Sequence, residues 1–142
     1  MIQKTVSYYI TMLYRSFAAF TGEHLQRVDM NYGLLFFIVY IGKRPGCSPA
    51  ELTRDLHLDW GHSQRSINRL AEDGFITKQK QGRQYCLTLT ERGQQAFAVA
   101  HQVFFDWDEA YFSGLNKEEK QQLLTLLAKA AERVPHHVRN DS

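Results

Sequence analysis

The apolar residues in the first part of the chain fall at helical spacing. They recur in steps of three and four residues, which places them on one face of a helix. A second apolar segment, from Tyr32 to about Ile41, follows Asn31, a residue type that caps helices. This segment is apolar nearly all round, as expected of a buried helix. The first segment predicts a long helix that packs on a large surface through Ile2, Val6, Tyr9, Ile10, Leu13, Phe17 and Phe20.

Two shorter helices joined by a tight turn are predicted in the middle of the chain. Ser48-Pro49-Ala50-Glu51 combines an N-cap serine, a proline suited to the first helical position and the glutamate of a capping box. Leu52 and Leu56, four residues apart, give this helix one buried face. His57-Leu58 forms the turn, and Asp59 is placed to cap the next helix.

The next helix has an apolar side and a polar side. It is predicted from Trp60 to about Asp73, with Ile67 and Leu70 on the apolar side. Arginine suits guanine edges, and glutamine or asparagine suits adenine edges, so the polar side fits a DNA groove. The alternative is an ordinary solvated face. The polar residues are His62, Gln64, Arg65, Asn68 and Arg69.

The pattern then changes from a helical period to strict alternation. Ile76-Thr77-Lys78 predicts a short strand, and the alternation from Tyr85 to Leu89 predicts a second, half-buried strand. Gln81-Gly82 lies between them and supplies the turn. The segment therefore predicts a small basic hairpin directly after the polar helix.

Two further helices complete the chain. Thr90 is placed to cap a long helix that ends near Phe112, and Asn116 with Glu119 forms a capping box for the last helix. The elements together predict a mainly α fold with a small β-hairpin, in the order of a winged helix-turn-helix between long terminal helices. The last helix is expected to turn inward Leu123, Leu124, Leu127, Ala130 and Val134.

The stretch from Ser48 to Gly93 resembles the MarR (multiple antibiotic resistance regulator) family of winged helix-turn-helix transcriptional regulators. The resemblance implies a homodimer whose first, fifth and sixth helices interlock. Residues 1–29 and 90–142 then form the dimerisation region, and residues 30–89 form the winged DNA-binding domain. The matching residues are Pro49-Ala50-Glu51-Leu52, Leu58-Asp59, Arg65, Arg69-Leu70, Gly74-Phe75-Ile76, Arg83 and Leu89-Thr90-Glu91-Arg92-Gly93.

Three departures from the family pattern affect the expected site. Gln81-Gly82-Arg83 replaces the Asp-x-Arg usual at the wing tip, and the hairpin is shorter, which predicts a wing of shorter reach. Ser63 and Ser66 replace apolar residues of the recognition helix, which predicts slacker docking. Trp60-Gly61 replaces the common Arg-Ser opening and removes one expected phosphate contact.

The resemblance implies a repressor that binds a palindromic operator in double-stranded DNA and is released by a small-molecule effector. Arg65 is expected to contact a base edge and Arg83 to border the minor groove. Lys78 and Lys80 are expected to contact phosphates. The alternative is a small-molecule-binding dimer that has lost sequence-specific DNA binding along with part of its wing.

Relatives in this family often bind small aromatic or phenolic ligands between the dimer helices and the winged domain. Such a pocket is mostly apolar, with a few polar groups that orient the ligand. Tyrosine hydroxyls are suited to orient a carboxylate or a phenol. The alternative is that the same rings fill the core. The candidate residues are Tyr9, Leu13 and Phe17 in the first helix and Phe36 and Tyr40 in the second.

Composition narrows the function without identifying a partner. The chain has 142 residues, of which 44% are hydrophobic, enough to bury a core, and its net charge is only +2. Eight basic and five acidic residues lie between Lys43 and Gln84, against nine and ten elsewhere. This mildly basic middle segment of the chain is suited to bind an anionic partner.

Other classes of protein are disfavoured. The longest uncharged run, Met30 to Gly42, has 13 residues, whereas a membrane span needs about 20. No secretory signal opens the chain, so we expect the protein to be located in a bacterial-type cytoplasm. No phosphate loop, nucleophile elbow or paired-carboxylate motif indicates an enzyme.

Cysteine and histidine give no sign of a cofactor or metal. Two cysteines do not make a disulfide framework. We expect Cys86 to be a small buried hydrophobe and Cys47 to be the more exposed thiol. Of the six histidines, only His136-His137 are close in sequence, and neither spacing nor context indicates metal ligands.

Overall fold

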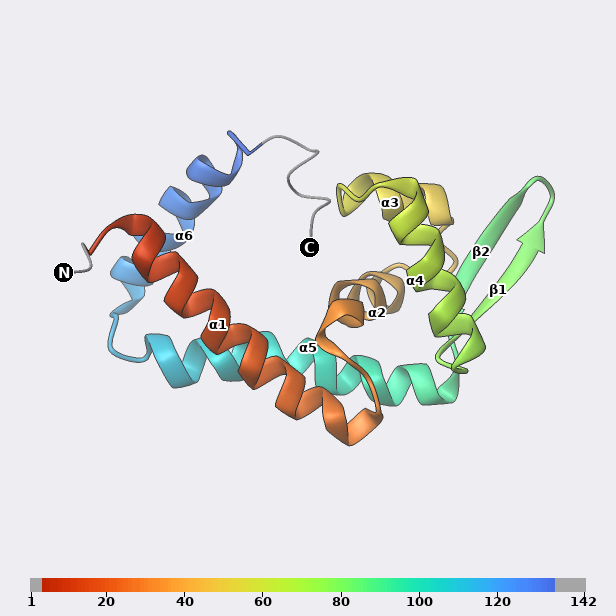
Figure 1. Ribbon diagram of the computed structural model, residues 1–142, viewed down its shortest axis with the longest axis horizontal. Helices are drawn as coiled ribbons and strands as arrows, with labels where there is room; N and C mark the ends of the chain where they lie inside the picture. Colours follow the sequence, from red (N-terminus) through yellow and green to blue (C-terminus); the bar gives the residue numbers. More distant parts are fainter. Residues whose placement is uncertain (1–3, 135–142) are drawn as a thin grey trace.

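The computed structural model describes residues 4–134 as a set of helices with one hairpin (Figure 1). The N-terminal end of α1 and the whole of α6 lie at one end of the molecule, α2 to α4 and the hairpin lie at the other, and α5 runs along both. This confirms the mainly α fold with a small β-hairpin. Ile2 and His136-His137 lie outside the described residues. The elements are α1 (Val6–Leu25), η1 (Gln26–Val28), η2 (Tyr32–Leu34), α2 (Leu35–Lys43), α3 (Pro49–Asp55), α4 (Trp60–Glu72), β1 (Ile76–Gln81), β2 (Gln84–Leu89), α5 (Glu91–Phe112) and α6 (Lys117–Ala131).

Four of the predicted helix starts are confirmed by their capping bonds. The side chains of Ser48, Asp59 and Thr90 each accept a hydrogen bond from the backbone N–H three residues later, at 3.1, 3.1 and 3.0 Å. Asn116 and Glu119 bond reciprocally at 2.8 and 2.9 Å, the predicted capping box. These bonds satisfy N–H groups that the first helical turn leaves without an intrahelical partner.

Two helix starts differ in detail from the prediction. Asn31 makes no capping bond, because a 3-10 turn (η2) precedes α2 and contains Gly33, which weakens an α-helical start. At α3, the carboxylate of Glu51 accepts a hydrogen bond from the Ser48 hydroxyl at 3.3 Å. The expected capping box has that carboxylate accept from the serine backbone N–H instead.

The hydrophobic core lies where the end of α1, α2, α3, α4, the hairpin and the first half of α5 meet. Residues of all these elements are withdrawn from solvent. Burial of this kind is the main source of stability in a domain of this size. The helices α2 and α5 approach closely at Gly42, where a Cβ would overlap the ring of Phe97. The core includes Leu25, Leu35, Ile38, Ile41, Leu52, Ile67, Leu70, Phe75, Leu87, Ala96 and Ala100.

The start of α5 packs directly on the chain that leaves α4. The backbone N–H of Thr90 donates to the carbonyl of Phe75 at 3.0 Å, and the Thr90 hydroxyl donates to the carbonyl of Gly74 at 2.6 Å. A Cβ at Gly93 would overlap that same Phe75 carbonyl. Gly93 is therefore required by the close approach of α5 to the backbone before β1.

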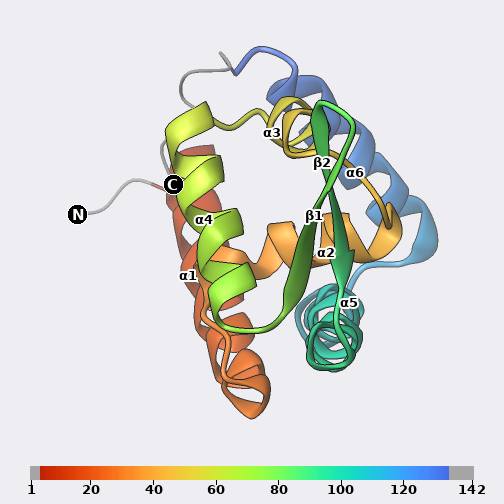
Figure 2. The same ribbon diagram turned by 90° about the vertical axis from the view of Figure 1, so that its right-hand side faces the viewer.

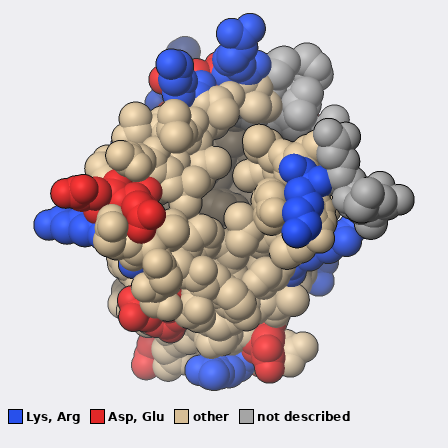
Figure 3. All heavy atoms as spheres, turned by 90° about the vertical axis from the view of Figure 1, so that its left-hand side faces the viewer, with Lys and Arg blue, Asp and Glu red and all other residues tan. Residues whose placement is uncertain are grey.

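The terminal helices keep their apolar residues largely exposed in a single chain. Within the described residues, α6 has no buried side chain, although its leucines were expected inside. Figure 3 shows this end of the molecule as a mainly uncharged surface, hollowed near its centre. The most exposed large apolar residues of α1, α5 and α6 are Val6, Tyr9, Ile10, Met12, Tyr14, Phe105, Tyr111, Leu124, Leu126 and Leu127.

Candidate nucleic-acid interface

The turn between α3 and α4 is the tight one that the sequence predicts. His57 adopts a left-handed backbone conformation, with φ at 56°, and the N–H of Leu58 donates back to the carbonyl of Thr53 at 3.0 Å. Asp59 then caps α4. Turn and cap together set the direction in which α4 leaves the core.

The recognition helix α4 docks through polar contacts where apolar ones were expected. Ser63 is fully buried, and its hydroxyl lies 2.6 Å from the hydroxyl of Thr53, which in turn donates to the carbonyl of Pro49 at 2.6 Å. Ser66 is also buried. Small side chains let α3 and α4 approach, and the bond between the hydroxyls satisfies both groups. This geometry differs from the slack docking expected for serines at these positions.

The predicted polar side of α4 divides into an exposed centre and two flanks. Arg65, Asn68 and Arg69 are exposed, because they lie opposite Ser63, Ile67 and Leu70 on the helix. His62, on one flank, is half-buried, with its ring 6.0 Å from the ring of Phe37. Three of the five polar residues predicted on α4 thus form an exposed surface, and two of these three are cations. His62 and Gln64 pack beside that surface.

Gln64 lies on the other flank and is half-buried. Its Nε2 is shielded from solvent and has no hydrogen-bond partner among the described residues. A buried amide without a partner is destabilising relative to one that is bonded. This side chain therefore has more to gain from a new polar contact than a solvated glutamine has.

The hairpin is longer and more regular than predicted. Its strands pair from Ile76 with Leu89 to Gln81 with Gln84, so the turn is Gly82-Arg83 and not Gln81-Gly82. Gly82 has a φ of +63°, and a positive φ at the first turn position is typical of tight hairpins. Arg83 is exposed at the tip of the wing. Figure 2 shows the hairpin projecting beside α4.

The two cysteines exchange the roles expected of them. Cys47 is only 5% exposed, because its backbone pairs with that of Leu87 on wing strand β2. Burial first, and the nearby Glu51 carboxylate second, raise the pKa of the Cys47 thiol to about 11. Cys86 is the half-buried thiol. The expectation of an exposed Cys47 is therefore wrong, because the sequence does not show the long-range pairing that covers it.

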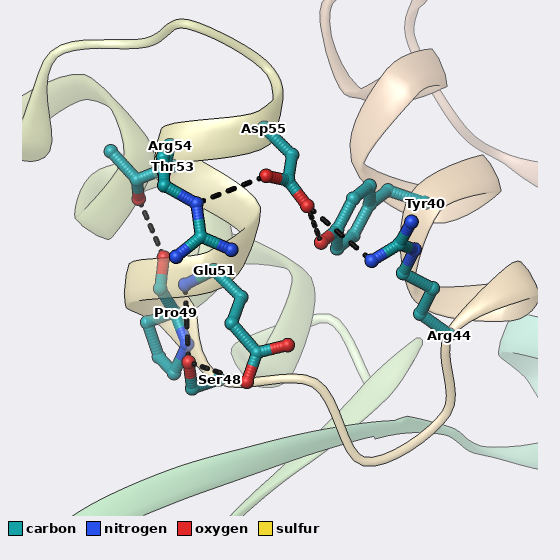
Figure 4. Close-up of polar contacts among 8 residues, drawn as sticks. All are labelled: Tyr40, Arg44, Ser48, Pro49, Glu51, Thr53, Arg54 and Asp55. Carbon is teal, nitrogen blue, oxygen red and sulfur yellow. Dashed lines mark hydrogen bonds and ion pairs between the residues drawn. The ribbon is translucent and has the colours of Figure 1, made fainter.

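A second candidate site is an open groove of about 630 Å³ between α2 and α3. At its centre, the Tyr40 hydroxyl donates to Asp55 at 2.6 Å, and Arg44 and Arg54 pair with the same carboxylate at 3.5 and 3.1 Å (Figure 4). The groove is lined by Phe36, Val39, Tyr40, Lys43, Arg44, Arg54, Asp55, Leu56 and His57.

The central hydrogen bond of this groove shifts the pKa of both partners. Burial, followed by the bond to Asp55, raises the pKa of Tyr40 to about 12. The bond from Tyr40, followed by that from Arg54, lowers the pKa of Asp55. The groove therefore combines an apolar wall with basic groups that outnumber the one carboxylate, and Tyr40 acts as a neutral donor between α2 and α3.

The predicted ligand-binding residues do not all line this groove, although Phe17 and Phe36 both pack against the ring of Phe104. Phe36 and Tyr40 line the groove, but Tyr9, Leu13 and Phe17 do not. Phe17 instead joins a cluster of rings between α1 and α5, 5.6 Å from Phe104 and 5.3 Å from Trp107. Sequence reasoning missed the basic lining of the groove, although Tyr40 and Arg44 are four apart on one helix and therefore share a face.

Other classes of site receive no support from the described residues. Nowhere in residues 4–134 do three or more His, Cys, Asp or Glu side chains lie close enough to hold a metal ion. No helix in that part of the chain is both long and apolar enough to cross a membrane.

Two helices joined by a tight turn, an exposed basic face on the second and a wing directly after it define a winged helix-turn-helix protein. The family model of the DUF6293 C-terminal winged helix domain matches residues 63–101. The HTH-type transcriptional regulator BilQ of Clostridium symbiosum (strain WAL-14163) is 40% identical over 140 residues, which cover 96% of this chain and 97% of BilQ.

Solved structures agree with this class. A MarR protein from Peptoclostridium difficile has a TM-score of 0.84 at 23% identity and covers 98% of this chain and 95% of its own. A MarR family regulator from Listeria monocytogenes, solved with a 26-mer DNA, has a TM-score of 0.79 at 21% identity and covers 92% and 89%. The chain belongs to the HTH-type transcriptional regulators, and it shares the fold of the MarR proteins among the solved structures. It is a regulator of transcription and not an enzyme.

Proposed function

We propose that two copies of this chain form a cytoplasmic homodimer that represses transcription by binding a palindromic operator, and that a small-molecule effector releases it. Residues 30–89 would form the DNA-binding domain, and residues 1–29 and 90–142 would form the dimerisation region. The observation that carries the proposal is the exposed surface of α4 beside the wing, where Arg65, Arg69 and Arg83 are all accessible.

The proposed DNA contacts follow from exposure and from side-chain chemistry. Arg65 lies at the centre of the exposed side of α4 and suits a bidentate contact with guanine in the major groove. Arg83, at the wing tip, suits the minor groove, and Lys80 suits a phosphate. The regulator from Listeria monocytogenes, solved with DNA, supports the same use of the fold. The two half-sites would lie about 10 base pairs apart, as two-fold symmetry requires.

A gel shift with DNA from upstream of the protein's own gene, at two salt concentrations, tests this proposal. We expect a shifted complex that weakens steeply as salt rises, because phosphate contacts release counterions. Arg83→Ala should weaken binding and lower the salt slope. A folded protein that shifts none of this DNA at either salt concentration would favour the alternative, a dimer that only binds small molecules.

The groove between α2 and α3 supports the effector part of the proposal. Phe36 and Tyr40 offer aromatic surface, and Arg44 at the rim offers a cation for a carboxylate or a phenolate. Arg44 already pairs with Asp55, so an acidic ligand would compete with the Asp55 carboxylate for the Arg44 guanidinium. Because Asp55 ends the helix before the recognition helix, that competition would reach the DNA-binding surface.

Thermal-shift screening with phenolic and aromatic carboxylic acids, followed by DNA competition, tests the effector. We expect a ligand that raises the melting temperature to weaken operator binding through a coupling of about 1–3 kcal/mol. A ligand that stabilises the protein and leaves the DNA affinity unchanged would show a pocket without a regulatory role.

A further inference from the structure

Lys78 lies on the face of the wing that continues the hydrophobic core. Residues two apart on a strand share a face, so Ile76, Lys78 and Lys80 form one row along β1. Ile76 is buried, Lys78 is half-buried and Lys80 is exposed. Across the ladder, Lys78 pairs with the fully buried Leu87. The stem of Lys78 therefore starts at the edge of the core, and only its ammonium group reaches out of it.

The Lys78 ammonium has two partners, one on the recognition helix and one on the wing. Its Nζ donates to Oδ1 of Asn68 on α4 at 3.3 Å. The same Nζ lies 4.6 Å from the centroid of the Tyr85 ring on β2. Tyr85 pairs with Lys80 and is thus the diagonal neighbour of Lys78 on the same face. One side chain therefore links the wing to the exposed centre of α4.

This contact fixes which end of the Asn68 amide faces the wing. An ammonium group only donates hydrogen bonds, so it selects the amide oxygen and turns the NH₂ group away from the wing. A free asparagine can rotate and present either end to a base. An asparagine bonded to Lys78 keeps its NH₂ group as the unengaged end, and NH₂ requires an acceptor.

We propose that Lys78, held by Tyr85, is a positioning residue that fixes the Asn68 amide so that its NH₂ group donates to an acceptor edge in the major groove. Guanine, thymine and the N7 atom of adenine present such acceptors there, whereas cytosine presents only a donor. Lys78 then takes no phosphate, in contrast to the phosphate role expected from the sequence. This inference rests on the proposed DNA-binding function and names a specificity determinant within it.

Lys78→Met and Lys80→Met form a matched pair that tests the inference. Both remove one charge from the same face of β1 and keep an unbranched side chain. The probe is a fluorescent duplex that the wild-type protein selects from a random pool, together with variants that carry each base pair at every half-site position. Affinities are measured by anisotropy at several salt concentrations.

Lys78→Met should reduce discrimination against cytosine at one position of each half-site, from about tenfold to near unity, with the salt slope unchanged. Lys80→Met should weaken all duplexes evenly and reduce the salt slope by about 0.9, the value of one phosphate contact. Tyr85→Leu should resemble Lys78→Met, and Tyr85→Phe, which keeps the aromatic ring, should resemble the wild type. The two Tyr85 variants also decide the question if Lys78→Met does not fold.

A Lys78→Met protein that behaves like Lys80→Met would overturn the inference and leave the proposed function intact. Preserved discrimination in both Lys78→Met and Tyr85→Leu would also overturn it. A wild-type protein that selects no duplex from the pool would contradict the proposed function itself.

Discussion

The winged lobe of this protein, which comprises residues 30–89 with the first half of α5, and the terminal helical region, which comprises α1, the second half of α5 and α6, use their apolar residues in opposite ways. In the lobe, Ile38, Ile67 and Leu70 are completely withdrawn from solvent, whereas on α6 Leu124 and Leu126 are 61% and 63% exposed. Exposed patches of this kind on a soluble protein mark interaction surfaces. The lobe has a core within one chain, and the terminal helices present a surface that we expect a second chain to cover.

The strongest test of this contrast is to place charges on α6. Leu124→Glu with Leu127→Glu should convert the proposed dimer to monomer and lower operator affinity by about 100-fold or more, because the second half-site contact is lost. Light scattering gives the mass, and anisotropy gives the affinity. Lys129→Glu, on the same helix, changes the net charge by the same amount and should leave the dimer intact. An unchanged mass in the double variant would reject this interface.

Two glycine substitutions test whether the winged lobe is more tightly packed than α1, by their effects on the free energy of unfolding. Gly93→Ala should lower the free energy of unfolding by about 1–3 kcal/mol or more, because the added Cβ meets the backbone carbonyl of Phe75 within the lobe. Gly22→Ala, in α1, has no atom within 4 Å of its new Cβ and should stabilise the helix by about 0.5–1 kcal/mol. Denaturant titration measures both. Equal effects would contradict the contrast between a tight lobe and an open terminal helix.

Arg65 tests whether the lobe reads sequence. Arg65→Ala should weaken operator binding by about 1–3 kcal/mol and relax base preference at one position of each half-site. The unfolding transition should not move, because Arg65 is exposed on α4. A uniform loss of affinity across all sequences would make Arg65 a phosphate contact.

The bond between Tyr40 and Asp55 should give a small, pH-dependent effect. Tyr40→Phe should lower the melting temperature at neutral pH, because Asp55 loses its neutral donor. The lowered pKa of Asp55 stabilises the fold above the ordinary carboxyl pKa, and this contribution is lost as pH falls through the folded value. The raised pKa of Tyr40, about 12, stabilises the fold below the ordinary tyrosine pKa, and this contribution is lost as pH rises toward 12.

Melting curves of the two proteins across pH test this account. The difference between Tyr40→Phe and the wild type should therefore be largest between the acidic range and about pH 10. If the difference in melting temperature stays constant into strong acid, the effect of Tyr40→Phe does not depend on the charge of the Asp55 carboxylate.

The local features of the fold could be predicted from the sequence, because each depends on neighbouring residues. The caps at Ser48, Asp59 and Thr90 and the polar side of α4 are of this kind. The contacts that could not be predicted join residues far apart in the chain. Lys78 reaches Asn68 only because the wing stands beside α4. The burial of Cys47 likewise depends on its pairing with Leu87, which periodicity does not reveal.

The stoichiometry of the complex with DNA tests the central claim most directly. The protein and a duplex from upstream of its own gene should be analysed together by sedimentation, with absorbance at two wavelengths to count chains and duplexes separately. We predict two chains on each operator duplex, in a complex that dissociates as salt rises because phosphate contacts hold it. A single chain per duplex, or a folded dimer that sediments apart from the DNA at low salt, would contradict it.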